Sequence, residues 1–428
     1  MAEPRTPPMS AERLATLVEE KVKRKAWEEG ANFGGNLPSE LDPAWIPVCD
    51  EIAFCAGLAK RPKQAVKLYE RAWAVDPDNW RRASALAYLY YEAALGRRKE
   101  DTYQRGRRRD VSAKRTPKPF EDLAELRDGF RKWIGIALTL RPDSVKDLYR
   151  LGMFESQVES RKDKVAFRVF LRALEAWDGL PAHLKERGDM RKYRSRILFA
   201  GGRSALRLGK LAWARKLSFQ CIREDGGGVA RVFQLALGGK VCLAMKDSES
   251  AERAFRLALD AEGPRSRDFL YGDLAQSLRD RRRLEDAVEV IDRNVPAARR
   301  PSYLWRFMGD LYVEQGDLER AEPCFEASLL KDRMGRHLTF ERLGRLARRK
   351  GDLPAAERAF RKAQESRRKQ YHSDDRAALT GLLEVLEARG KSEEAAKVAE
   401  RLAALGDAPG GGRGTPSPEC DDLRRAEV

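Results

Sequence analysis

The sequence predicts an all-α chain built of repeated antiparallel helical hairpins. Three observations lead to this prediction: a pattern of about 35 residues recurs, small residues recur where helices must pack closely, and the composition suits an extended array. Hydrophobic residues make up 42% of the chain and charged residues 35%. This mixture is too apolar for a disordered chain and unusually charged for one compact globule, whereas a stacked solenoid with thin cores tolerates it.

The repeat is clearest as an alanine followed four residues later by a large apolar residue. The leading alanines of the four clear copies are 36, 34 and 35 residues apart. Weaker copies flank them at Ala214 and Ala395, and similar patterns begin at Ala65 and Ala166. The clear pairs are Ala251/Phe255, Ala287/Ile291, Ala321/Phe325 and Ala356/Phe360.

Small and large residues are placed within each copy as two packed helices require. Gly309 and Gly344 are small where two backbones must approach, while aromatic residues fill the space between successive hairpins. The Gly-Asp dipeptides at 316–317 and 351–352 predict the turn between the two helices of a hairpin. Glycine accepts a left-handed helix end, and aspartate caps the start of the next helix.

These residues and spacings resemble the tetratricopeptide repeat family, whose copies are about 34 residues long. The resemblance covers about residues 46–405 and is strongest in 231–366. It implies a right-handed superhelical solenoid with a concave groove that is lined by the first helix of each hairpin. In this family the groove usually receives an extended or helical peptide, so the resemblance implies a protein-binding scaffold and not an enzyme.

Changes in composition divide the chain into four segments. Residues 1–44 are expected to hold one charged helix, about Ser10–Glu28, and a flexible glycine-rich segment. Residues 45–194 and 195–405 carry the N-terminal and the C-terminal repeats. Residues 406–428 are rich in glycine and proline and are expected to form a disordered tail.

Two interruptions break the period. A strongly basic insertion at 97–118 is expected to form a long loop inside one repeat, whose second helix then begins near Phe120. A second interruption at 179–193 is expected to form a spacer helix or a long loop before the repeat that starts near Ile197. The sequence leaves open whether the array is one superhelix or two blocks hinged near 180–194.

The net charge of +17 favours acidic partners. Arginine forks match carboxylates, so a series of basic residues on the first helices predicts a groove for an acidic segment of a partner protein. The alternative interpretation of these residues is a solvated basic face. The predicted groove residues are Arg196, Arg203, Arg207, Lys240, Arg306, Arg342, Arg345 and Arg349.

One subclass of the family grips the C-terminal carboxylate of a chaperone with a set of lysine, asparagine and arginine side chains. Arg306 and Arg342 match this set in part, but Asp310 stands where an amide is needed. This departure argues against a clamp for chaperone tails.

A nucleic acid is the alternative partner. The basic insertion 97–118 could contact phosphates, although no sequence pattern of a known nucleic-acid-binding fold accompanies it. The candidate contacts are Arg105, Arg107, Arg108, Arg109, Lys114 and Arg115.

The sequence shows no catalytic signature and no metal-ligand spacing, so we expect no enzyme, no cofactor and no metal. The glycine clusters 226–228 and 238–239 lack the preceding strand of a phosphate-binding loop. His183, His337 and His372 are far apart in the sequence, and we expect all three at the solvated surface.

The remaining expectations concern cysteines, location and self-association. Cys221, Cys242 and Cys324 lie in helical patterns and are expected to be reduced and buried. No stretch is apolar enough for a signal peptide or a membrane span, which favours a soluble cytoplasmic protein. The apolar run Leu379–Leu386 could support self-association if the last hairpin left it uncovered. The sequence does not determine the oligomeric state.

Overall fold

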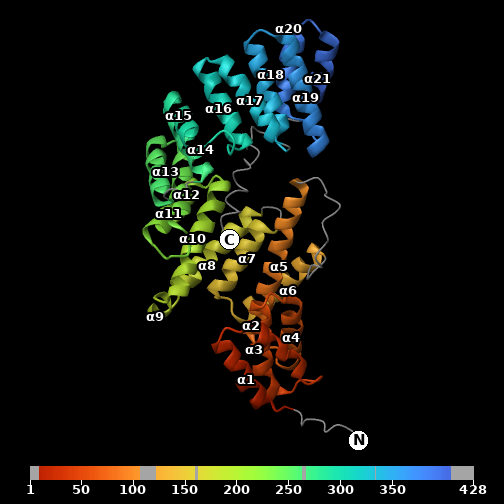
Figure 1. Cartoon of the computed structure of the whole chain (residues 1–428), viewed down its shortest axis with the longest axis vertical. Helices are drawn as coiled ribbons and strands as arrows, with labels where there is room; N and C mark the ends of the chain where they lie inside the picture. Colours follow the sequence, from red (N-terminus) through yellow and green to blue (C-terminus); the bar gives the residue numbers. More distant parts are fainter. Residues whose placement is uncertain (1–8, 107–121, 160–161, 263–266, 333, 406–428) are drawn as a thin grey trace. The chain divides into compact units, whose positions relative to one another are not determined.

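The computed structural model describes residues 9–106, 122–159, 162–262, 267–332 and 334–405, with 97–106 described by their backbone alone. Every regular element among these residues is a helix (Figure 1). The chain divides into two compact units, Met1–Ala230 (unit 1) and Arg231–Val428 (unit 2). The predicted all-α array of antiparallel helical hairpins is confirmed.

Unit 1 contains four hairpins, α3/α4, α5/α6, α7/α8 and α10/α11, preceded by two N-terminal helices. Its helices are α1 (Ala11–Lys23), α2 (Trp27–Asn32), η1 (Phe33–Asn36), η2 (Pro43–Trp45), α3 (Ile46–Leu58), α4 (Pro62–Val75), α5 (Trp80–Gly106), α6 (Leu123–Leu140), α7 (Val145–Gln157), α8 (Asp163–Asp178), α9 (Ala182–Lys185), α10 (Gly188–Arg207) and α11 (Leu211–Arg223).

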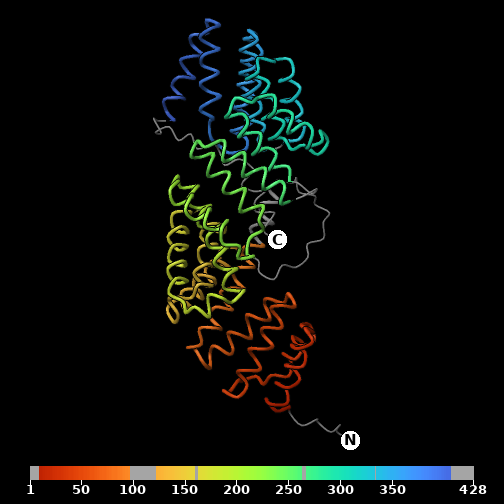
Figure 2. Tube along the Cα trace, turned by 90° about the vertical axis from the view of Figure 1, so that its left-hand side faces the viewer, coloured from red at the N-terminus to blue at the C-terminus, as the bar shows by residue number. Residues whose placement is uncertain are grey.

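Unit 2 contains five hairpins, and in each the second helix runs back along the first (Figure 2). Its helices are α12 (Arg231–Ala244), α13 (Ser248–Glu262), α14 (Asp268–Asp280), α15 (Leu284–Asn294), α16 (Ser302–Gln315), α17 (Leu318–Lys331), α18 (Arg336–Arg349), α19 (Leu353–Tyr371), α20 (Arg376–Ala388) and α21 (Ser392–Ala404).

The hairpins are closed by a glycine of the first helix that faces an aromatic ring of the second. A Cβ atom on Gly309 would lie 2.4 Å from the ring of Phe325, and one on Gly344 would lie 2.7 Å from the ring of Phe360. Both rings are fully buried. The same contact joins Gly152 to Phe170 and Gly239 to Phe255. The predicted pairing of small and large residues is therefore confirmed.

The Gly-Asp turns also form as predicted. Gly316 and Gly351 adopt φ angles of 85° and 81°, in the left-handed region that glycine tolerates. The carboxylate of Asp317 accepts a hydrogen bond from the backbone N–H of Arg320 at 2.9 Å, and Asp352 caps α19 in the same way. Each dipeptide thus ends one helix and starts the next.

The predicted single helix at Ser10–Glu28 is wrong, because the chain breaks between α1 and α2. Lys25 takes a left-handed φ of 56°, so α1 ends at Lys23 and α2 begins at Trp27. The apolar side of α1, with Leu14 and Val18 fully buried, packs against α3. The two short helices therefore cover the open end of the first hairpin.

The basic insertion begins later than predicted. Helix α5 continues through Gly106, because the stretch after Gly96 carries no proline and mostly residues that favour a helix. The second helix of this hairpin, α6, starts at Leu123, close to the predicted Phe120, where Asp122 caps it by accepting from the backbone N–H of Ala124 at 2.9 Å. The rest of the insertion, from residue 107 to 121, lies outside the described residues.

The second interruption contains the short helix α9, which agrees with the predicted spacer helix. The next repeat, however, does not begin near Ile197. Helix α10 already starts at Gly188 and packs against α8 and α7. Arg194 anchors this early part of α10, since its guanidinium pairs with Asp178 at 3.2 Å and with Glu224. The two compact units accordingly divide after Ala230 and not at the predicted segment boundary between 194 and 195.

The last hairpin does not leave its apolar run uncovered. Leu379, Leu382 and Leu386 are buried in one cluster with Ala395 and Val398 of α21. Self-association through this apolar face therefore has no basis. None of the described helices combines the length and the apolarity that a membrane span needs.

Candidate functional site

The exposed side of the first helices is the surface where the sequence places the candidate binding residues. Residues three or four positions apart share one side of a helix, so each first helix turns one row inward and presents another at the surface. We call this surface the first-helix face, and each unit has its own. It consists of α3, α5, α7 and α10 in unit 1 and of α12, α14, α16, α18 and α20 in unit 2.

Ion pairs connect successive first helices in unit 2. Lys240 of α12 lies 3.2 Å from Asp273 of α14, and the Nε atom of Arg279 donates to Glu314 of α16 at 2.8 Å. The pattern continues with Asp310 of α16, whose two carboxylate oxygens accept from the Nε atom of Arg342 at 2.9 Å. The same kind of pair joins Arg348 of α18 to Glu384 of α20.

The predicted groove residues Lys240 and Arg342 therefore have carboxylate partners within the protein. Asp310, which argued against a chaperone-tail clamp, is the partner of Arg342. The acidic partners Asp273 and Glu314 were missed by the sequence analysis. A repeated opposite charge about one repeat further along the chain was the signal that could have identified them.

Arg306 lies inside unit 2 and not on its surface. Only 5% of this residue is exposed, and its guanidinium pairs with Asp332 and approaches the hydroxyls of Ser328 and Thr339 at 3.4 and 3.5 Å. The two hydroxyls are 3.1 Å apart. This network joins α16, α17 and α18, so Arg306 supports the fold and is not available to a partner.

Two predicted residues of unit 2 remain at the surface. Arg345 is 61% exposed and pairs with Glu341 on its own helix, and Arg349 donates to the backbone oxygen of Val313 at 3.0 Å. Glu341 is buried, so Arg345 also neutralises an interior carboxylate, whereas the contact of Arg349 is a single hydrogen bond to the backbone. Both guanidinium groups are exposed and can be reached by a partner.

The predicted residues of unit 1 lie on α10 but differ in exposure. Arg203 is buried beside the ring of Phe199, and Arg207 pairs with Asp163 at 3.3 Å. Arg196 is exposed, and its Nε atom donates to the backbone oxygen of Gly228 at 3.3 Å. Of these three residues, Arg196 is the one that a partner can reach.

The candidate nucleic-acid contacts cannot be placed. The side chain of Arg105 is not among those described, and Arg107, Arg108, Arg109, Lys114 and Arg115 lie outside the described residues. A nucleic-acid partner for the insertion therefore stays a prediction.

No side-chain constellation in the described part of the chain suggests catalysis or metal binding. The described cysteines are buried and reduced, and burial raises the pKa of the Cys49 and Cys324 thiols to about 11. No group of histidine, cysteine and carboxylate side chains in the described ranges could hold a metal ion. A Cβ atom on Gly228 would lie 2.3 Å from the backbone oxygen of Lys192, so this glycine packs against α10.

His337 departs from the prediction that all three histidines are solvated. His183 and His372 are exposed, but His337 is buried, and its Nδ1 atom has no hydrogen-bond partner. Its Nε2 atom lies 3.2 Å from Arg367. Burial, and then the positive charge of Arg367, lower the pKa of His337. The charged residues around this position in the chain gave no sign of the burial.

We expect His337 to make the stability of unit 2 depend on pH. A histidine whose pKa is lowered by folding stabilises the protein fully above the unfolded pKa of about 6.5. This stability is lost as the pH falls through the lower folded pKa. Arg367 and Arg306 oppose protonation, whereas Asp375 and Asp332 favour it. The variant His337→Phe should therefore lose less stability than the wild type between pH 7 and 5 in urea titrations. Equal losses in the two proteins would contradict this assignment.

The described residues form stacked helical hairpins, and the candidate binding residues lie on the first helices of these hairpins. Together with the lack of a catalytic constellation in these residues, this architecture is that of an α-helical repeat protein. Sequence models described as "Tetratricopeptide repeat" match residues 341–411 and 304–330. The chain thus carries tetratricopeptide repeats in these residues. Among the curated proteins, none matches its sequence significantly.

Three solved structures resemble the fold at 14% identity each. The APC/C hetero-tetramer Cut9-Hcn1 matches 93% of this chain and 75% of its own, with a TM-score of 0.40. A tetratricopeptide repeat protein from Parabacteroides merdae matches 69% and 99%, with a TM-score of 0.47. The C-terminal part of a repeat-containing protein from Cytophaga hutchinsonii matches 58% and 95%, with a TM-score of 0.41.

Proposed function

We propose that the protein is a non-catalytic scaffold that binds an acidic segment of a partner protein on its first-helix faces. Tetratricopeptide repeats indicate a protein–protein interaction scaffold. The observation that supports an acidic segment is the exposure of Arg196, Arg345 and Arg349 on the first helices, in a chain of net charge +17. A carboxylate of a partner can pair with each of these exposed guanidinium groups.

The contacts of the other predicted residues determine which substitutions can test this proposal. Arg306 and Arg203 are buried, so reversing their charge would damage the fold and would lower binding for that reason alone. The test therefore uses the three exposed residues.

We expect the triple variant Arg196→Glu, Arg345→Glu, Arg349→Glu to capture its partner from native lysate at least about tenfold less efficiently than the wild type, because each reversal repels a carboxylate. The captured proteins are identified by mass spectrometry, and cross-linking locates the segment that contacts the first helices. That segment should be acidic.

The matched control carries the same charge change on second helices, at the exposed residues Arg215 of α11, Arg253 of α13 and Arg358 of α19. The triple variant Arg215→Glu, Arg253→Glu, Arg358→Glu should capture the partner as the wild type does. Undiminished capture by the first-helix triple variant, or a cross-linked segment without acidic residues, would overturn the proposal.

A further inference from the structure

The first-helix face of unit 1 carries a cluster in which cations lie over tyrosine rings. The first helices of unit 2 are instead joined by ion pairs. The cluster consists of Tyr88 of α5, Lys146 and Arg150 of α7, and Tyr193 and Arg196 of α10. The Arg150 guanidinium lies 4.8 Å from the centre of the Tyr88 ring. Lys146 and Arg196 lie 5.5 and 5.9 Å from the centre of the Tyr193 ring. The cluster therefore joins three successive first helices.

Buried contacts hold the cluster in place. Asp147 is fully buried, and its carboxylate accepts from the hydroxyls of Ser84 and Ser144 at 2.6 Å and from Arg150 at 2.9 Å. Arg150 is thereby fixed over Tyr88. A surface that is ordered before binding loses less side-chain entropy when a partner arrives.

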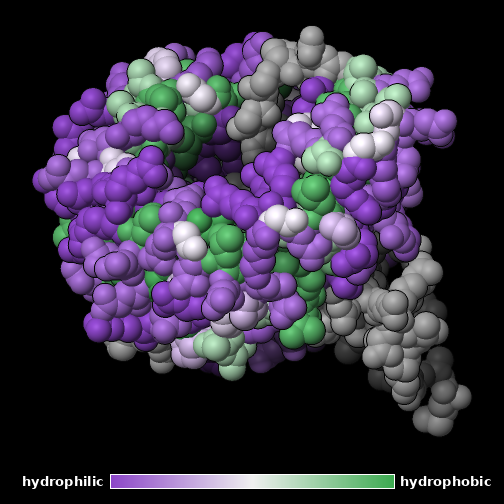
Figure 3. All heavy atoms as spheres, turned by 90° about the horizontal axis from the view of Figure 1, so that it is seen from above, coloured by the Kyte–Doolittle hydropathy of each residue, from purple (hydrophilic) through white to green (hydrophobic). Residues whose placement is uncertain are grey.

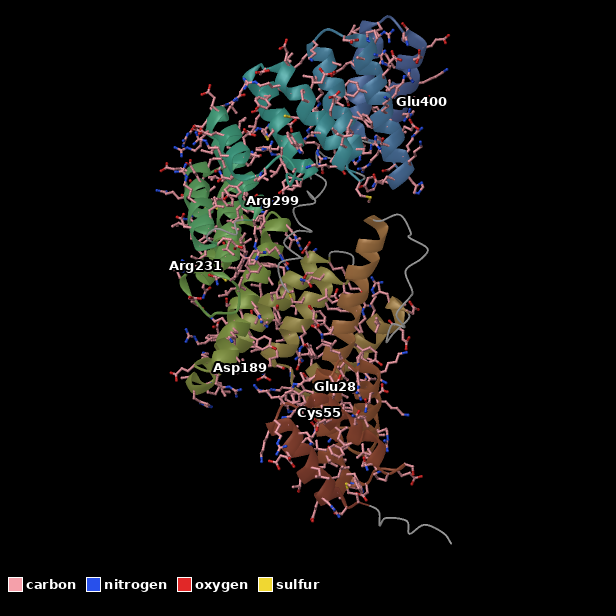
Figure 4. The ribbon with its side chains drawn as sticks, in the orientation of Figure 1. Glu28, Cys55, Asp189, Arg231, Arg299 and Glu400 are labelled. Carbon is pink, nitrogen blue, oxygen red and sulfur yellow. The ribbon has the colours of Figure 1, made fainter. Side chains whose placement is uncertain are left out.

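A second anchor fixes the α10 side of the cluster. The ring of Tyr193 packs edge-on against Tyr149 of α7, with the ring centres 5.7 Å apart. Lys146 pairs with Asp189 at the start of α10 at 3.1 Å, and Figure 4 labels Asp189 beside α9. Lys146 and Asp189 are both partly exposed, so this pair lies at the surface.

The same face is apolar at its α3 end. Phe54 and Leu58, one helical turn apart on α3, are 48% and 45% exposed, and Tyr88 is 43% exposed. Tyr88 follows Phe54 by one repeat, so the two rings occupy equivalent positions on successive first helices. Figure 3 shows another side of the molecule, seen from above, which is largely hydrophilic with some hydrophobic patches. On the α3 and α5 face, an exposed apolar group near a basic cluster marks a candidate binding surface.

We propose that this face binds an amphipathic acidic segment of a partner protein in a bipartite manner. An aromatic or aliphatic side chain of the segment packs on Phe54, Leu58 and Tyr88, and its carboxylates pair with Lys146 and Arg196. This inference rests on the proposed function and deepens it, because it names the chemistry of the segment and assigns it to unit 1.

The charges on this face favour a peptide over a nucleic acid. Glu51 is exposed on α3 beside the apolar pair, and Asp189 lies beside Lys146. A continuous phosphate backbone along the face would meet these carboxylates, whereas a peptide can place single acidic residues only where the cations are.

The test is a selection of binding peptides from a random displayed library on the full-length protein. The wild type should enrich peptides that contain acidic residues together with leucine, phenylalanine or tryptophan. Phe54→Ser, Leu58→Ser should remove the apolar preference and retain the acidic one. Lys146→Glu, Arg196→Glu should remove the acidic preference. Each double variant should bind the peptides selected by the wild type about tenfold more weakly or worse.

Matched controls make the same changes on second helices. Leu257→Ser, Leu330→Ser removes two exposed leucines of α13 and α17, and Arg215→Glu, Arg253→Glu reverses two exposed arginines. Both controls should select the same peptides as the wild type. Circular dichroism must show that each variant keeps its helix content, and a variant that loses helix is replaced by its Phe54→Gln or Lys146→Gln single form.

Three outcomes would overturn the inference. Acidic peptides that lose binding only in an Arg345→Glu, Arg349→Glu variant would assign the site to unit 2 and leave the proposed function intact. A library that yields no acidic preference at all would contradict both proposals. Binding of polyuridylate that depends on Lys146 and Arg196, without any selected peptide, would identify a nucleic acid as the occupant.

Discussion

Arg306→Ala should lower the free energy of unfolding of unit 2 by about 3–5 kcal/mol, because the substitution leaves the buried carboxylate of Asp332 without its cation. Asp332 is largely buried and among the described residues keeps the backbone N–H donors of Met334 and Gly335, at 2.9 and 2.6 Å. Hydrogen exchange of the α16, α17 and α18 amides in the full-length protein measures this change locally. Exchange in unit 1 should not change.

Two control variants separate the buried charge from other effects of the substitution. Arg306→Met combined with Asp332→Asn removes both charges and should recover most of the loss, since a buried ion pair contributes little compared with an apolar replacement of similar size. Arg349→Ala removes an exposed arginine that donates one hydrogen bond to a backbone oxygen, and it should cost about 0–1 kcal/mol. If Arg306→Ala costs no more than Arg349→Ala, the buried network does not support the fold as we describe.

The outcome also bears on the interpretation of binding experiments. Eight basic residues were predicted to line one groove, and the structure assigns them different roles. Arg306 connects three helices in the interior, Lys240 and Arg342 join successive first helices, and Arg196 and Arg345 are exposed. A loss of binding on substitution therefore identifies a partner contact only at the exposed positions.

The hairpins could be predicted from the sequence because their determinants are local and strict. A glycine must face the ring of Phe325 or Phe360, and a left-handed turn must follow the first helix at Gly316 or Gly351. Few residue types satisfy either requirement, so the pattern recurs with little variation. The same constraints do not reach the N-terminal segment, and there the break at Lys25 was missed.

Whether each arginine is buried, paired or exposed could not be predicted, because this depends on a partner residue in another repeat. The helical period places Arg342 on the first-helix face, but its pairing with Asp310 depends on how two hairpins stack. The burial of Arg306 depends similarly on Asp332, which directly follows the next helix, and on Thr339, which belongs to the next hairpin. Periodicity within one helix contains no information about such neighbours. The aromatic cluster around Tyr88 was missed for the same reason, since its five members come from three hairpins.

Phe360→Ala should lower the free energy of unfolding of unit 2 by about 3–5 kcal/mol, the usual cost of emptying a buried phenylalanine site. The Phe360 ring is fully buried between two hairpins, because Cβ atoms on Gly344 of α18 and Gly381 of α20 would lie 2.7 and 2.4 Å from it. The cavity therefore weakens the last two hairpins together. Amide exchange should accelerate throughout α18 to α21 and remain unchanged in α3 and α4.

The packing explanation can be separated from a general loss of apolar area by a double-mutant cycle with Gly381→Ala. In the wild type the added methyl collides with the Phe360 ring and should cost about 1–3 kcal/mol, partly offset by the better helix propensity of alanine. In the Phe360→Ala background the methyl enters the cavity, so both effects favour the folded state and the same substitution should stabilise by about 1 kcal/mol. The change of sign follows only if ring and glycine occupy the same space. An effect of Gly381→Ala with one sign in both backgrounds would show that α19 and α20 pack in another register.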